Sequence, residues 1–240
     1  MRINLTINTL DKSQRKTARL AGLLYLFLII TGAYGTIYVS SQINVKDDAA
    51  TVAKNILSNE FLFRTGFISD LLSNIIFVLL VLVLYRLFKQ VNEHQAKLMV
   101  VLVVVQIPAV FIMEALNITS LMIFKGEILQ SFELNQQHDL AMLLLNINEY
   151  GMMTLEMFWG LWLFPFGLLV YKSGFIPRIF GILLIIAGVA YMSSSFVSLL
   201  FPGYSAFISQ PTLLLVAIGE ISITLWLLIK GVKNNISAIE

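Results

Sequence analysis

Residues 213–229 read LLLVAIGEISITLWLLI, an apolar run with a single acidic residue, Glu220, near its centre. The run approaches the roughly 20 apolar residues that a helix needs to cross a lipid bilayer. Because the bilayer interior offers no water to the backbone, a helix that bonds internally is the structure expected there. The run therefore predicts a transmembrane helix, and Glu220 needs an explanation, since a charge at mid-depth is costly.

Similar segments recur along the chain and decide the fold class. The 240 residues are 58% hydrophobic and 12% charged, whereas about a quarter of a soluble domain is charged. None of the segments alternates like a strand of a membrane barrel. The sequence predicts an all-α polytopic membrane protein, a bundle of six transmembrane helices. The predicted segments are 20–39, 67–88, 98–124, 150–171, 179–201 and 212–229.

The distribution of lysine and arginine predicts the orientation, because cytoplasmic connections are enriched in both. Twelve of the sixteen lie on the side of the two termini, and four lie on the other side: Lys46, Lys54, Arg64 and Lys125. We therefore expect both termini in the cytoplasm. The expected organisation is a basic tail over 1–16, a six-helix membrane domain over 17–232 and a second tail over 233–240. The first segment is too long for the apolar region of a signal peptide and is expected to be retained.

Four stretches carry a resemblance to a known family. They are TARLAGLLYLFLIITGAYG, SDLLSNIIFVLLVLVLYRLFKQVN, GLLVYKSGFIPRIFGILLIIAGVAYM and GEISITLWLLIKGV. Between Thr17 and Val232 the chain resembles the bacterial integral-membrane family catalogued as domain of unknown function 4386. Its most distinctive piece, YKSGFIPRIFG, has Lys172 where the family more often has arginine. The resemblance implies a six-helix protein of the bacterial cytoplasmic (inner) membrane, and it implies no activity and no ligand residue.

Five acidic residues lie within or at the edges of the predicted spans, with no lysine or arginine at comparable depth. A helix rises about 1.5 Å per residue, which places all five acids in the outer half of the bilayer or near its middle. Glu149 is expected at the outer boundary of the fourth segment. This placement predicts a polar cavity that opens outward. The acids are Asp70, Glu114, Glu149, Glu156 and Glu220.

Helical spacing adds polar neighbours to these acids. Ser69, Asp70, Ser73 and Asn74 share one face of the second segment, and the third segment has Gln106, Glu114 and Asn117 within a moderate arc. In the fourth segment Asn146, Glu149, Glu156 and Gly160 follow a three-or-four spacing. Such carboxyl and amide oxygens suit protons, Na⁺ or hard divalent ions. The alternative interpretation is hydrogen bonding that joins helices. The predicted lining residues are Asp70, Asn74, Glu114, Asn117, Glu149, Glu156 and Glu220.

Three other patterns favour structural roles. Gly174, Gly181 and Gly188 recur every seven residues, which favours close helix packing. Pro108 and Pro165 lie inside predicted spans, where proline kinks a helix. The segment MFWGLWLFP, residues 157–165, has two tryptophans beside Glu156. Their expected role is bulk packing, with an aromatic wall around a ligand as the alternative.

Known catalytic motifs are missing from the sequence. There is no cysteine, no phosphate-binding loop and no metalloprotease or serine-hydrolase signature. No cofactor is identifiable, and no nucleic-acid partner is expected; the expected partner is the lipid bilayer. Binding or transport of a proton, cation or small cationic solute is favoured. A structural, sensory or assembly subunit is the second hypothesis, and an intramembrane enzyme that uses carboxylates or a metal is the third. The oligomeric state stays open.

Overall fold

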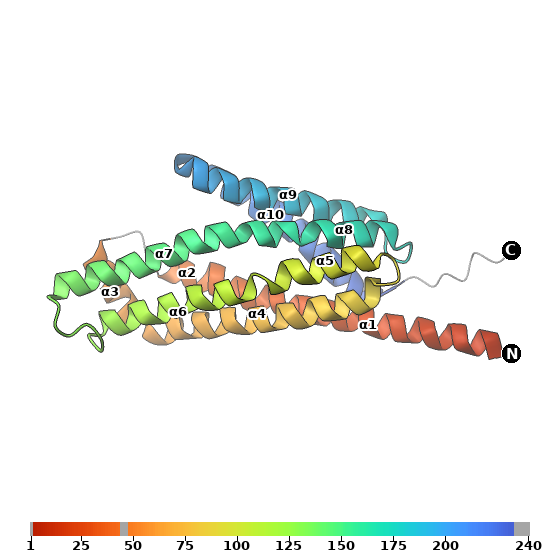
Figure 1. The fold of residues 1–240 in the computed structure, drawn as a ribbon, viewed down its shortest axis with the longest axis horizontal. Coiled ribbons are helices and arrows are strands. Elements are labelled where there is room, and N and C mark those ends of the chain that lie inside the picture. Colours follow the sequence, from red (N-terminus) through yellow and green to blue (C-terminus); the bar gives the residue numbers. More distant parts are fainter. Residues whose placement is uncertain (1, 44–47, 233–240) are drawn as a thin grey trace. The chain divides into compact units, whose positions relative to one another are not determined.

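The structure is a computed structural model that describes residues 2–43 and 48–232, with side chains from Ser13 onward. Lys46, Lys233 and the predicted tail over 233–240 lie outside the described residues. Within these ranges every element is a helix (Figure 1). The elements are α1 (Arg2–Ala33), η1 (Tyr34–Val39), α2 (Ser40–Gln42), α3 (Ala49–Ser58), α4 (Glu60–Phe88), α5 (Glu93–Val104), α6 (Ile107–Phe124), α7 (Leu134–Leu161), α8 (Leu163–Lys172), α9 (Arg178–Leu200), η2 (Pro202–Tyr204) and α10 (Ser205–Ile229).

Six helical runs in the described residues are long and apolar enough to cross a membrane, which confirms the predicted all-α, six-helix membrane protein. The fourth run begins at Leu134, well before the predicted start at residue 150. Hydropathy marks only the part of a helix that lies in lipid, so the polar extension of the helix escaped the prediction. The runs are Ser13–Gln42, Glu60–Phe88, Glu93–Phe124, Leu134–Lys172, Arg178–Leu200 and Pro202–Ile229.

Two of these runs are interrupted at the prolines that predicted kinks. Helix α5 ends at Val104, four residues before Pro108, and α7 ends at Leu161, four residues before Pro165. A proline has no N–H to bond the carbonyl four residues earlier, and its ring clashes with that carbonyl. Each proline therefore divides one span into two helices.

The chain forms two compact units, and each is described by itself. Unit 1 comprises residues 1–26, 76–105 and 156–240, and in it α9 packs against α8 and α10. Gly160 faces Gly188 and Gly167 faces Gly181, so closely that a Cβ on Gly181 would lie 2.6 Å from the Gly167 carbonyl oxygen. The predicted close packing is thus confirmed for Gly181 and Gly188.

Gly174 has a different role from the other two glycines of the seven-residue pattern. It has φ +72°, a left-handed conformation that glycine adopts without strain, in the turn between α8 and α9. The Ser173 hydroxyl accepts a hydrogen bond of 3.3 Å from the Ile176 backbone N–H in the same turn. The Arg178 guanidinium lies over the Tyr171 ring, 5.4 Å from its centroid. This turn is the centre of the YKSGFIPRIFG sequence.

Unit 2 comprises residues 27–75 and 106–155. Its helix α3 begins after Asp48, whose carboxylate accepts hydrogen bonds of 3.1 Å from the backbone N–H groups of Ala50 and Thr51. A further hydrogen bond from the Thr51 hydroxyl is the main reason that the pKa of Asp48 lies below its ordinary value. Helix α3 packs against α6 and buries Val52 and Ile56 in the core of this unit.

Candidate functional site

The predicted lining residues divide between the two units. Unit 2 contains Asp70, Asn74, Glu114, Asn117 and Glu149, whereas unit 1 contains Glu156 and Glu220. A single cavity shared by acids of both units stays a prediction. In the described part of the chain, no group of three or more histidine, aspartate or glutamate residues could hold a metal ion.

In unit 2 Asp70 of α4 and Glu114 of α6 are close enough for their charges to act on each other. Glu114 is 2% exposed, and its Oε2 accepts a hydrogen bond of 3.2 Å from Asn117 Nδ2. None of the ion pairs found in the described residues includes either carboxyl group. Two acids from different spans are therefore near each other, and no ion pair found in the described residues balances either charge.

The element opposite Asp70 is η1, a π-helix turn that begins at Tyr34. Gly35 of η1 is buried, and the Asp70 carboxyl group lies directly against it: a Cβ at this position would be 2.5 Å from Asp70 Cγ. Single π turns within α-helices are rare and occur frequently at functional sites. Only a residue without a side chain leaves room for the carboxyl group here.

Hydrogen bonds attach η1 and the end of α1 to α4. The Ser69 hydroxyl donates to the Thr31 carbonyl oxygen at 2.9 Å, and the Tyr34 and Thr65 hydroxyls share a hydrogen bond of 2.8 Å. Ser69 and Ser73 are each 8% exposed, which confirms a buried polar face on the second predicted span. These contacts position Asp70 against Gly35.

The remaining polar residues of unit 2 contribute less to the pair. Asn74 donates through Nδ2 to the Asp70 backbone carbonyl at 2.9 Å, so it does not reach the Asp70 carboxyl group. Glu149 lies well inside α7, because this helix begins at Leu134, and its place at the outer boundary of the membrane span stays a prediction. Asn146 is exposed, whereas Asn148 donates to the Met113 carbonyl oxygen of α6 at 2.8 Å. The sequence pattern therefore missed Asn148, which is offset from the predicted stripe.

Unit 1 contains Glu156 of α7 and Glu220 of α10, and a site shared by the two stays a prediction. Glu156 of α7 lies beside the Ser194 hydroxyl of α9, and the Tyr25 hydroxyl of α1 faces the Glu220 carboxyl group of α10. Tyr191 of α9 is close enough to both acids for the charges of their carboxyl groups to act on its hydroxyl group. Sequence reasoning missed the three hydroxyl-bearing residues, since one tyrosine or serine in an apolar helix is unremarkable.

Aromatic rings pack densely around this neighbourhood. Trp162 is 2% exposed and stacks on Phe166, with ring centroids 5.3 Å apart. Phe77 meets Trp162 edge-on at 4.9 Å, and Tyr25 lies 5.9 Å from it. The bulk-packing role predicted for this tryptophan is confirmed.

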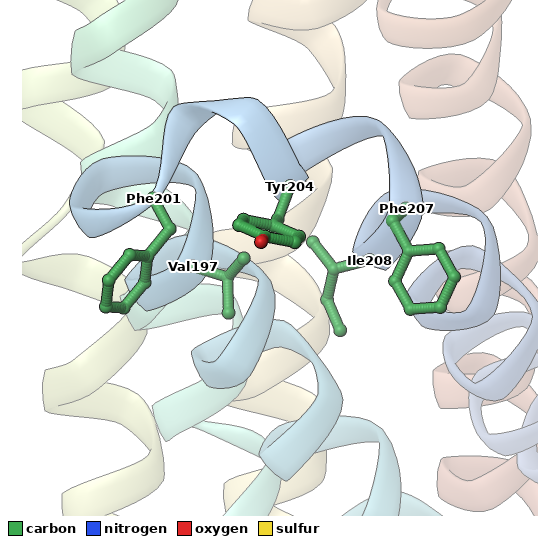
Figure 2. Close-up of a pocket in the computed structure, with 5 residues that line it drawn as sticks. All are labelled: Val197, Phe201, Tyr204, Phe207 and Ile208. Atoms are coloured by element: carbon green, nitrogen blue, oxygen red, sulfur yellow. The ribbon is translucent and has the colours of Figure 1, made fainter.

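A hollow of about 380 Å³ lies in unit 1 at the turn between α9 and α10. Figure 2 shows the apolar and aromatic side chains that line it, with the Tyr204 hydroxyl oxygen drawn in red. None of the predicted acids lines this hollow. Its lining residues are Val197, Phe201, Tyr204, Phe207 and Ile208.

Comparison with known proteins decides the family. The family model described as "Domain of unknown function (DUF4386)" matches residues 20–231. The chain belongs to this family. The DUF4386 chain is also 41% identical over 76 residues to an uncharacterized protein of Archaeoglobus fulgidus. The match covers 32% of this chain and spans 43% of the length of that relative. No solved structure matches the chain.

The two carboxyl neighbourhoods of this DUF4386 protein differ in their partners. The Asp70–Glu114 pair has an amide and a glycine backbone beside it. Glu156 and Glu220 instead have hydroxyl groups beside them. Carboxylates that are close to each other repel, so the Asp70–Glu114 pair is stable when it holds a proton or a cation. The first neighbourhood offers several oxygen ligands, and the second offers hydrogen-bond partners for a proton.

Proposed function

We propose that this membrane protein binds a small cation at Asp70 and Glu114, where a proton and an alkali-metal ion such as Na⁺ exchange. The observation that carries the proposal is Glu114, an acid that is 2% exposed inside a span and is in none of the ion pairs found in the described residues. Asp70 is close enough for the charges of the two acids to act on each other. An ionised carboxylate inside a span is costly unless a proton, cation or donor compensates it. A bound cation or a shared proton supplies that compensation.

The available ligand atoms support a small hard ion. Asn117 uses its Nδ2 to donate to Glu114, which leaves its Oδ1 free to accept or to coordinate. Carboxylate and amide oxygens are the ligands that hard cations prefer. A divalent site is less well supported, because the described residues contain no cluster of three acidic or histidine ligands.

The proposal includes a location and an orientation. The chain is a multi-pass membrane protein, and we place it in the bacterial cytoplasmic membrane with both termini in the cytoplasm. The excess of lysine and arginine on the side of the termini supports this orientation. The favoured role is cation binding as one step of transport. In the alternative, a sensor without transport activity, the cation binds at the same site.

A second candidate function is a structural or assembly subunit. The specific observation in its favour is that Ser69 and Asn148 donate hydrogen bonds to backbone carbonyl groups of other helices. Polar groups of this kind join helices inside a membrane. On this hypothesis the acids also serve packing, and no ion affects stability. The third hypothesis, an intramembrane enzyme, stays a prediction without a supporting contact.

Thermal unfolding of the purified protein in detergent tests the proposal. Sodium chloride and choline chloride are compared at equal ionic strength over a range of pH. A ligand at 100 times its dissociation constant stabilises the folded state by about 2.7 kcal/mol. We expect Na⁺ to raise the Tm of the wild type, and Asp70→Asn and Glu114→Gln each to abolish the effect.

Glu149→Gln is the matched control, because it removes the same charge from the same unit and should keep the sodium response. If no alkali-metal ion stabilises the wild type more than Asp70→Asn, the cation site is contradicted. Variants that simply melt earlier, with no ion effect in any protein, would favour the structural subunit.

A further inference from the structure

The ends of four helices meet at one end of unit 1. Phe88 is the last residue of α4, and its ring stacks on Phe175 in the turn between α8 and α9, with centroids 5.7 Å apart. The ring of Phe180 in the first turn of α9 lies 5.2 Å, between centroids, from Trp226 in the last turn of α10. These contacts hold the ends of α4, α8 and α10 and the start of α9 together.

Five exposed lysine and arginine residues lie at this end of the unit. Each is within two residues of a terminus of a membrane run, because these runs end at Phe88, Lys172 and Ile229 or begin at Arg178. None of the ion pairs found in the described residues includes any of the five. We call these residues the basic end of unit 1: Arg86, Lys89, Lys172, Arg178 and Lys230.

The acidic residues of unit 1 do not balance the charge of the basic end. Where the structure describes side chains, the acidic residues of this unit are Glu93, Glu156 and Glu220. Glu93 is paired with Lys97 at 3.0 Å. Glu156 and Glu220 lie inside membrane runs, well before the ends of these runs at Lys172 and Ile229. The basic end therefore presents an excess of positive charge.

The position of the basic end along the helices indicates which anions it meets. The ends of membrane runs lie at the boundary between hydrocarbon and lipid headgroups. Lipid phosphate oxygens are at this level, and lysine and arginine bind phosphate through charge-assisted hydrogen bonds. Clusters of four to eight basic residues next to spanning helices are typical of sites for anionic lipids. The number, exposure and depth of the five cations fit this chemistry.

We propose that the basic end of unit 1 is a binding surface for the headgroups of anionic phospholipids in the surrounding bilayer. The turn between α8 and α9 is its centre, with Lys172 and Arg178 on either side of the turn. The ends of α4 and α10 contribute the other cations. The surface belongs to unit 1, and it does not depend on cation binding at Asp70 and Glu114 in unit 2.

Thermal unfolding in mixed micelles tests this surface. The full-length protein in detergent receives phosphatidylglycerol or phosphatidylcholine with the same acyl chains at the same mole fraction, in choline chloride without sodium. A ligand that binds the folded state raises its stability, so we expect a higher Tm with phosphatidylglycerol. Choline chloride at about 1 M should reduce the difference, because it shortens the screening length to about 3 Å. Inorganic phosphate without lipid should not reproduce the effect.

Neutralising the basic end should remove most of the difference in Tm between the two lipids. The test variant combines Lys89→Gln, Arg178→Gln and Lys230→Gln. The matched control removes three positive charges from unit 2, at Lys54, Arg64 and Lys125, and should keep the difference. The two variants lose the same net charge, so a general attraction to anionic micelles weakens equally in both.

The proposal is overturned if phosphatidylglycerol raises the Tm of the wild type no more than phosphatidylcholine or free phosphate does. Equal loss of the lipid effect in the two triple variants also overturns it. In either case the basic residues would serve only to orient the chain in the membrane. Should the test variant fail to fold, Lys89→Gln against Lys54→Gln decides, since both residues are exposed and outside the ion pairs found in the described residues.

The same measurement separates this surface from the proposed cation site. Asp70→Asn should keep the response to phosphatidylglycerol, whatever this variant does to sodium binding. If Asp70→Asn abolished the lipid response, the independence of the surface would be contradicted.

Discussion

At the scale of single residues, Gly35 determines where the Asp70 carboxyl group can lie. The carboxyl group occupies the space that a side chain at residue 35 would fill. The obstructing atoms belong to the end of a short side chain, which can rotate away more easily than backbone can. A substitution at Gly35 should therefore move Asp70 before it disrupts the helices.

We predict that Gly35→Ala abolishes the sodium-dependent rise in Tm while lowering stability only modestly. Overpacking usually lowers the free energy of unfolding by about 1–3 kcal/mol. We expect a loss near the lower end of this range, because the Asp70 side chain can rotate away. Thermal unfolding with sodium chloride and with choline chloride measures both effects. Gly203→Ala is the control, since a Cβ at Gly203 would meet nothing within 4 Å. A Gly35→Ala protein with an intact sodium response would show that Asp70 does not need its observed position.

The sequence predicted some residues of the candidate sites and could not predict others. Asp70, Glu114 and Glu220 were found because an acid is out of place in an apolar span. Gly35 and Tyr25 were not found, because a glycine or a tyrosine is ordinary in such a span. Their importance comes from contacts between helices, which spacing along one helix does not reveal.

At the scale of elements, the contact of α8 with α9 depends on paired glycines. A Cβ on Gly181 would lie 2.6 Å from the Gly167 carbonyl oxygen and 2.8 Å from the Tyr171 backbone nitrogen. Both obstacles are backbone atoms, so no change of rotamer relieves the clash. The two helices would have to move apart.

We predict that Gly181→Ala lowers the free energy of unfolding by about 1–3 kcal/mol or more, the usual effect of overpacking. A lower Tm in thermal unfolding checks the prediction. The control is Gly32→Ala, another helical glycine, where the nearest atom to a Cβ is Ser73 Oγ at 3.4 Å. Alanine favours a helix over glycine by up to about 1 kcal/mol, so this control should be neutral or stabilising. Equal melting of Gly181→Ala and wild type would contradict the packing account.

Hydropathy predicted the elements better than their ends. All six spans and the breaks near Pro108 and Pro165 follow from composition and proline chemistry. The start of α7 at Leu134 could not be predicted from hydropathy, because the first residues of this helix are polar and show no apolar pattern. The π turn η1 also has no sequence signal, since it depends on how the end of α1 fits against α4.

At the scale of the whole molecule, charge divides between the segments of the two units. The segments of unit 1 contain twelve lysine and arginine residues and five acidic residues. The segments of unit 2 contain four lysine and arginine residues and nine acidic residues. The basic set is the one that predicted the cytoplasmic side. The two carboxyl neighbourhoods also fall in different units, which a depth estimate along single helices could not predict.

Proton release on addition of salt tests the central claim most directly. Purified protein is placed in weakly buffered detergent solution with a pH-sensitive dye, and sodium chloride or choline chloride is added. If Na⁺ replaces a proton on the Asp70–Glu114 pair, sodium should acidify the wild-type sample and choline should not. Glu149→Gln should behave like wild type, and Asp70→Asn and Glu114→Gln should release no proton. Equal release from wild type and Asp70→Asn, or from sodium and choline, would contradict a cation site at this pair.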